Sequence, residues 1–107
     1  MRLVVDNTAG GDREFAADVA QALRRCGLEV EQREAQRPTR FDTAVHLVTA
    51  GLAIRVSERP ERDLLDTIER VVRDSLMHRP SLRRRTRSVP VQLGETGRVL
   101  EWIDVFD

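Results

Sequence analysis

The densest cluster of like charge in the sequence is a run of arginines that could bind an acidic partner. The run contains Arg83, Arg84, Arg85 and Arg87, and Arg79 comes just before it. Guanidinium groups bind carboxylates and phosphates through paired hydrogen bonds, so the run predicts contact with an acidic protein surface or a phosphate backbone. Because no Phe or Tyr is interleaved to stack on bases, we favour protein over nucleic acid. The alternative is a solvated connector in a chain whose 18 basic residues are all arginine.

Aromatic residues near the end of the chain are the second candidate for binding. Trp102 and Phe106 share one face of a strand predicted over Arg98–Val105, together with Leu100. If the opposite face, with Ile103, is buried, these three side chains form an exposed apolar patch of the kind found at interface centres. The reverse orientation buries Trp102 in the core, and one strand cannot fix its own facing. Pairing of this strand with a second copy would make a homodimer.

A glycine-containing turn, DNTAGGD from Asp6 to Asp12, follows the first predicted strand and precedes a helix. Ligands often bind at this position in open α/β sheets, where a helix N-terminus favours phosphate. The spacing is not G-x-G-x-x-G, the chain has no lysine, and the two aspartates would repel an anion in the absence of a metal. We therefore interpret the segment as a turn with an N-cap. A nucleotide- or metal-binding enzyme domain that uses this turn is the alternative.

The remaining titratable residues form no catalytic pattern. His78 is predicted at a helix C-terminus, His46 lies in an apolar run, and Cys26 is spaced like a core residue of the first helix. A single cysteine allows neither an internal disulfide nor a multi-cysteine zinc site. Four carboxylates from separate segments could meet in space: Asp6, Asp42, Asp66 and Glu101. We expect no catalytic residue, no cofactor and no metal.

Composition predicts a small globular protein in a reducing compartment. The 107 residues suit one domain over 1–107, and the formal net charge of +0 provides no overall field to attract nucleic acid or a membrane. We find neither a signal-peptide core nor an apolar run long enough to span a bilayer. The lone cysteine and the absence of lysine lead us to expect a cytoplasmic protein encoded by a GC-rich bacterial genome.

Two amphipathic helices must position these residues. The first is predicted over about Arg13–Arg25, with Asp12 as N-cap and Gly27 closing the C-terminus. The second is predicted over Pro60–Arg79, before Pro80. Its apolar residues recur at steps of three and four, which is typical of one buried helical stripe. This stripe consists of Leu64, Leu65, Ile68, Val71, Val72 and Leu76.

The other segments predict a sheet. Strands are expected over Arg2–Asp6, Leu28–Glu34, Ser88–Leu93 and Arg98–Val105, the last two forming a C-terminal β-hairpin. Between them, Ala44–Val56 is interpreted either as a hairpin or as a short helix followed by one strand. This order predicts an α+β fold, a ferredoxin-like two-layer sandwich with two helices on one face of a mostly antiparallel sheet. A crossover helix should make the first two strands parallel.

Two family resemblances add to this interpretation. The segment DREFAADVAQALRRCGLEVEQRE, 12–34, is similar to the start of TIR-type domains, in which an FA-x-x-L-x-x-AL helix precedes a G-L-x-V strand. The rest of the chain departs from that pattern, so NAD cleavage is not carried over. The segments LLDTIERVVRDSL, RRRTR and VPVQLGETGRVLEWIDV resemble the C-terminal half of the small effector-associated constant components of bacterial conflict systems. That resemblance implies a non-catalytic adaptor encoded beside effectors.

We therefore expect a non-catalytic protein-interaction or adaptor module of a bacterial signalling or conflict system. Its partner is expected to be a protein, either a co-encoded effector or a second copy, with no membrane partner. The residues expected to bind are Arg83, Arg84, Arg85, Arg87, Trp102 and Phe106. The alternatives are the enzyme domain described above and nucleic-acid binding through Arg83–Arg87. The sequence leaves the identity of the partner and the oligomeric state open.

Overall fold

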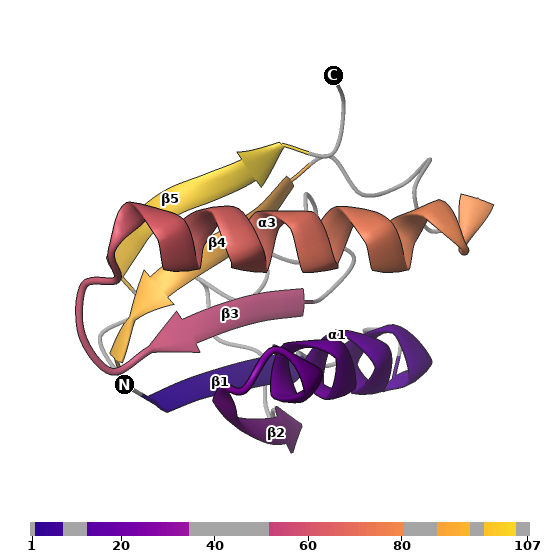
Figure 1. Cartoon of the computed structure of the whole chain (residues 1–107), viewed down its shortest axis with the longest axis horizontal. Coiled ribbons are helices and arrows are strands. Elements are labelled where there is room, and N and C mark those ends of the chain that lie inside the picture. Colours follow the sequence, from indigo (N-terminus) through magenta and orange to yellow (C-terminus); the bar gives the residue numbers. More distant parts are fainter. Residues whose placement is uncertain (1, 8–12, 35–51, 81–87, 95–97, 105–107) are drawn as a thin grey trace.

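The chain forms one five-stranded sheet and two helices (Figure 1). The computed structural model describes residues 2–7, 13–34, 52–80, 88–94 and 98–104. The elements are β1 (Arg2–Asn7), α1 (Arg13–Arg25), β2 (Glu29–Glu34), β3 (Leu52–Val56), α3 (Arg62–Met77), β4 (Ser88–Leu93) and β5 (Arg98–Asp104). Each described helix and strand lies within about two residues of a predicted one. The segment 35–51, with the predicted strand Ala44–Val48, lies outside the described residues.

The sheet consists of two β–α–β units that meet at its centre. The strand order is β2-β1-β3-β4-β5. The helix α1 connects the parallel neighbours β1 and β2, as predicted, and α3 lies between the parallel neighbours β3 and β4 in sequence. The two units join where β1 pairs with β3 in antiparallel orientation, and β5 extends the sheet by pairing antiparallel with β4. The two C-terminal strands are therefore antiparallel neighbours, while residues 95–97 of the turn predicted between them lie outside the described residues.

The prediction of a mostly antiparallel sheet is wrong, because two of the four neighbouring strand pairs are parallel. A ferredoxin-like sheet is built from split units, in which another strand separates the two parallel ones. Here β2 lies directly beside β1, and β4 lies directly beside β3. An α-helix is about 10 Å across, and neighbouring strands lie about 4.8 Å apart. One helix can therefore cover two parallel strands that lie directly side by side.

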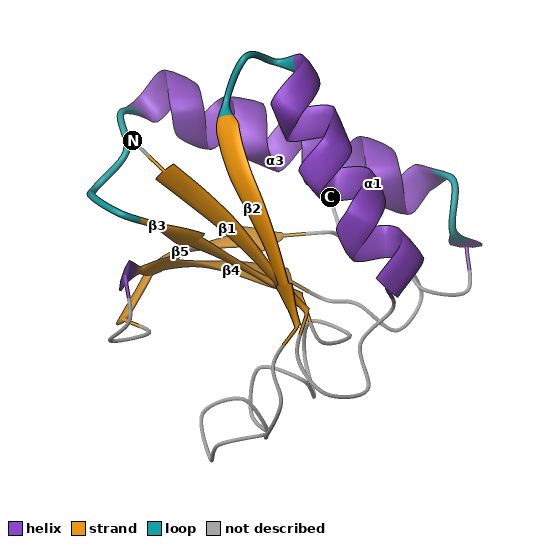
Figure 2. Ribbon diagram, turned by 90° about the horizontal axis from the view of Figure 1, so that it is seen from below, coloured by secondary structure: helices purple, strands orange, loops and turns teal. Residues whose placement is uncertain are grey.

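Both helices pack on the same face of the sheet (Figure 2). The core between the two layers holds apolar side chains from every described element. Its largest fully buried members are Phe15, Leu23, Leu3, Leu52, Ile54, Ile68 and Leu76. An ion pair between Arg79, just beyond α3, and Asp18 of α1 links the helical layer across its surface. No helix in the described ranges is long and apolar enough to cross a membrane.

The end of α1 forms a Schellman motif, which corrects one prediction. The Gly27 N–H donates to the Arg24 carbonyl at 2.9 Å, and the Leu28 N–H donates to the Leu23 carbonyl at 3.4 Å. Gly27 has a φ of 85°, the left-handed conformation that this motif requires. Cys26 occupies the C-cap position and is exposed, whereas its spacing predicted a core residue. The chain leaves the helical path there, so the 3.6-residue periodicity no longer applies.

Replacement of Gly27 by alanine should lower the free energy of unfolding by about 1 kcal/mol, because an L-residue is strained in the left-handed region. A Cβ built at this position meets nothing within 4 Å, so the cost is a backbone effect. Urea denaturation measures it. Gly27→Asn is the control and should lose less, because Asn adopts this conformation more readily. A Gly27→Ala variant as stable as the original chain would contradict the assignment.

Candidate functional site

The edge strand β5 exposes an aromatic side chain. Ile103 pairs with Val89 and is buried in the core, so the neighbouring Trp102 points to the face of the sheet opposite the helices. Trp102 lies across from Pro90, and 45% of its surface is exposed. Of the two orientations that the sequence left open, the protein therefore adopts the one with an exposed tryptophan.

A β-bulge changes the predicted apolar patch. Val91 pairs with Glu101 but the next residue, Gln92, pairs with Val99, so Leu100 is the extra residue on β5. Leu100 is partly buried against the core instead of sharing the exposed face with Trp102. The alternation predicted for this strand fails at that point, because a bulge shifts the facing of every residue beyond it.

The helix α3 holds the inner side of β5 through charged contacts. Arg62 lies 3.3 Å from a carboxylate oxygen of Glu101 on β5 and 3.2 Å from one of Asp66 on its own helix. Further along, Arg73 Nε donates to the Asp104 carbonyl at 2.9 Å. Two of the four carboxylates singled out in the sequence thus converge on one arginine. These contacts fix β5 against α3 and orient the Trp102 face away from the helices.

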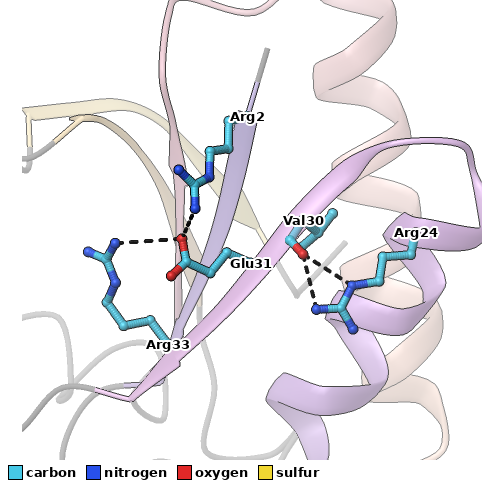
Figure 3. Close-up of polar contacts among 5 residues, drawn as sticks. All are labelled: Arg2, Arg24, Val30, Glu31 and Arg33. Carbon is cyan, nitrogen blue, oxygen red and sulfur yellow. Dashed lines mark hydrogen bonds and ion pairs between the residues drawn. The ribbon is translucent and has the colours of Figure 1, made fainter.

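Charged side chains flank the opposite edge strand, β2 (Figure 3). Arg24 of α1 donates from Nε and Nη2 to the Val30 carbonyl at 3.1 and 3.0 Å, so one acceptor of this strand is occupied. On the face of β2 opposite α1, Glu31 Oε2 lies 2.5 Å from Arg2 Nη2 and 3.8 Å from Arg33 Nη2. Charged side chains on an edge strand hinder pairing with another chain. An arginine from a helix occupies one strand carbonyl at each edge, so the two edges differ in the face opposite the helices, which carries charge at β2 and Trp102 at β5.

A buried ion pair lies where β1 meets β3. Arg55 Nε is 2.8 Å from Asp6 Oδ2, and the two side chains are only 18% and 5% exposed. Asp6 was considered as part of a phosphate-binding turn, but this contact joins it to the neighbouring strand. Arg55 also lines a pocket of about 240 Å³ on the face opposite the helices, together with Arg2 and Arg33. The positions of Asp6 and Arg55 in the sequence do not predict that the two residues form an ion pair.

A second pocket lies at the carboxyl ends of the parallel strands β1 and β2. It has a volume of about 300 Å³ and is lined by Asn7, Arg13, Gln32 and Arg33. Arg13 is the first residue of α1, so the helix N-terminus borders the pocket. We call this the carboxyl-end pocket. The sequence pointed to this region through the segment Asp6–Asp12, which was interpreted as a turn with an N-cap, and not through these four side chains.

Several predicted site residues lie outside the described part of the chain. They are Arg83, Arg84, Arg85, Arg87 and Phe106 of the expected binding surface, together with Asp12, Asp42 and His46. His78 is described: it is exposed at the C-cap of α3, with Nδ1 2.9 Å from the Asp74 carbonyl. Within the described ranges, no group of three or more His, Cys, Asp or Glu side chains could hold a metal ion.

Removal of the Arg55 guanidinium by Arg55→Met should destabilise the protein by about 3 kcal/mol, because it takes the charge partner away from a buried carboxylate. The double variant Asp6→Leu, Arg55→Met should recover most of that loss, since an apolar pair leaves no buried charge. Urea denaturation compares the variants.

The matched control for this prediction is Arg2→Met. Its ion pair with Glu31 is 59% and 39% exposed, so the expected loss is below about 1 kcal/mol. If the single Arg55 variant and the double variant were equally unstable, the Asp6–Arg55 contact would not be the cause.

Comparison with known proteins gives no relative from which a function could be transferred. No family model matches the chain, and no curated protein matches it in sequence.

Proposed function

We propose that this chain is a non-catalytic protein-interaction module that binds a protein partner along the outer edge of β5. The observation that carries this proposal is the exposed Trp102 on an edge strand, with 45% of its surface accessible. A tryptophan is among the side chains most enriched at the energetic centres of interfaces. A partner that covers it removes a large apolar surface from water, which is the main source of free energy in association.

The contrast between the two edges supports β5 as the binding edge. At β2, Arg24 already occupies the Val30 carbonyl, and Glu31 carries two arginine partners. At β5, the contacts with α3 involve the Glu101 side chain and the carbonyl of the last residue of the strand, Asp104, and leave Trp102 exposed. A partner strand that adds to a sheet edge gains main-chain hydrogen bonds, and pockets for alternate side chains provide specificity.

The resemblance to effector-associated constant components supplies the biological context of the proposal. The segments that carry it include β4, β5 and most of α3. We propose that the module acts in the bacterial cytoplasm as an adaptor of a signalling or conflict system. Its partner is then an effector protein encoded beside it. The run Arg83–Arg87 would add charged contacts to an acidic patch on that effector.

Trp102→Ala should weaken the complex at least tenfold, since truncation of a central interface tryptophan commonly costs more than about 1.4 kcal/mol. The chain is co-expressed with the product of each adjacent gene, and complexes are detected by size-exclusion chromatography with light scattering. Dissociation constants then follow from titration calorimetry. The same chromatography of the chain alone reports self-association through the β5 edge.

Met77→Ala is the control for this experiment. Met77 is the other large apolar side chain exposed in the described residues, at 63%, but it lies at the end of α3. Its removal should leave association unchanged, and neither variant should alter the free energy of unfolding by more than about 0.5 kcal/mol. Equal affinity of the Trp102→Ala variant and the original chain would refute β5 as the binding edge.

The double reversal Arg84→Glu, Arg85→Glu should weaken the same complex and reduce its dependence on salt concentration, because two cationic contacts become repulsive. Gel shifts with duplex and single-stranded DNA or RNA at low salt test the alternative. Retardation that disappears in the reversed variant would favour nucleic-acid binding through this run, against the protein partner proposed here.

A further inference from the structure

We propose that a pocket on the face of the sheet opposite the helices binds a carboxylate joined to a compact apolar group, as in a short-chain organic acid or the C-terminal residue of a peptide. The pocket has a volume of about 240 Å³ and crosses the junction between β1 and β3. This volume lies below the range of about 300–1,000 Å³ for drug-sized ligands, so a smaller group fits it. We call it the three-arginine pocket, and its lining includes Arg2, Val4, Glu31, Arg33, Arg55 and Gly94.

Strand alternation and register bring these residues together. Arg2 and Val4 point to the same side of β1. Val4 pairs with Glu31 of β2 on one side and with Arg55 of β3 on the other. Arg33 follows Glu31 on the same face of β2, and both Arg2 and Arg33 extend toward the Glu31 carboxylate (Figure 3). Val4 therefore lies at the centre of the cluster, with a charged residue on each side.

Arg55 is the residue that would bind the carboxylate. Its side chain is 18% exposed, and its Nε lies 2.8 Å from Asp6 Oδ2. Within the described residues this ion pair is its one polar contact, so the two terminal nitrogens, Nη1 and Nη2, have no partner there. The Nε atom is buried, whereas the terminal nitrogens keep accessible surface. Two N–H groups that lie side by side on a guanidinium match the two oxygens of a carboxylate.

The charges in and beside the pocket favour a singly charged anion. Arg2 and Arg33 share the carboxylate of Glu31, and Arg55 is paired with Asp6. This group of five side chains therefore contains one more cation than anions. A carboxylate supplies the missing negative charge, whereas a phosphate monoester carries about 1.5 to 2 negative charges at pH 7. The ligand class that matches this charge is a monocarboxylate.

The floor and one side of the pocket suit an apolar group. Val4 is partly exposed at the floor, and arginine side chains add the apolar surface of their CH₂ stems. Gly94 lines the pocket without a side chain, and a Cβ built there meets nothing within 4 Å. An acid with a branched apolar group would cover Val4 while its carboxylate meets Arg55. Such binding removes apolar surface from water, which is favourable.

The test is a titration of the nitrogen-15-labelled chain at low ionic strength, followed by amide chemical shifts, with 3-methylbutanoate, acetate and inorganic phosphate. 3-Methylbutanoate should bind about tenfold more tightly than acetate, because its additional carbon atoms are buried. It should also bind more tightly than phosphate. The shifts should concentrate at residues 2–4, 31–33 and 54–57 and leave the indole N–H of Trp102 unchanged, which separates this site from the β5 edge.

A peptide that ends in valine distinguishes the two sources of this chemistry, because a C-terminal valine has the carbon skeleton of 3-methylbutanoate. Tighter binding of the peptide than of 3-methylbutanoate would support a peptide ligand, and the reverse order would support a free organic acid. Amidation of the peptide should abolish its binding. Equal binding of the amidated peptide would contradict the role of the carboxylate.

Glu31→Gln should raise the affinity for 3-methylbutanoate severalfold, because it removes the carboxylate that competes for Arg2 and Arg33. Glu29→Gln is the matched control. It makes the same change on the same strand, at a residue that pairs with Arg2 in register but does not line the pocket, so its effect should be smaller. A substitution that only loosened the structure would lower the affinity, so the direction of the change separates binding from stability.

The double variant Asp6→Leu, Arg55→Met removes the guanidinium without leaving a buried charge behind. It should lose at least about tenfold in affinity for 3-methylbutanoate, as expected for a charge-assisted contact. Arg25→Gln removes one positive charge at the end of α1 and should bind as the original chain does. Circular dichroism establishes that each variant is folded, and the two glutamate variants decide the question if the double variant is not.

Four results would overturn the proposal. The first is the absence of binding by both 3-methylbutanoate and the valine peptide. The second is acetate or phosphate binding as tightly as 3-methylbutanoate. The third is a Glu31→Gln variant that binds no more tightly than Glu29→Gln. The fourth is a folded double variant that keeps the affinity of the original chain, which would remove the role of Arg55.

Discussion

The antiparallel contact between β1 and β3 is the constraint on which the rest of the structure depends. Each β–α–β unit alone is a two-stranded sheet with one helix, too small to bury its apolar face. Joining the units brings Leu3 and Val5 beside Val56 and Ile54, so that both helices cover one continuous core. On the other face, the same junction places the Asp6 carboxylate against the Arg55 guanidinium. Because a buried charge is tolerated only with its partner, this pair favours one register of the two strands.

This arrangement separates the two candidate sites. The β5 edge lies at one end of the sheet, beyond the second unit, whereas residues of β2, β1 and β3 supply most of the three-arginine pocket. Three strands, β1, β3 and β4, lie between β2 and the strand β5 that carries Trp102. A partner on β5 can therefore be bound without covering the pocket, and a ligand in the pocket leaves Trp102 exposed. The two proposals can be tested and can fail separately.

Local patterns in the sequence predict the helices well, because the residues that indicate each helix lie within or beside its own segment. The stripe that contains Ile68 and Val72 is buried, and Gly27 adopts the conformation that its position after α1 requires. No local pattern of this kind indicates which distant segments contact one another. The direct pairing of β2 with β1, the contact of Asp6 with Arg55 and the grouping around the carboxyl-end pocket all depend on how separate segments meet. The bulge on β5 is local, yet its alternating pattern continues through Leu100 without any visible break.

The exposed position of Cys26 makes the chain suitable for attachment at a single defined point. It is the only cysteine in the sequence, and it lies just beyond the C-terminal end of α1. The three-arginine pocket lies on the face of the sheet opposite that helix, and β5 lies at the far edge of the sheet. A fluorophore or a surface tether coupled through this thiol would leave both faces of interest accessible. With no lysine side chains to compete for the reagent, the protein can be immobilised in one orientation without altering its sequence.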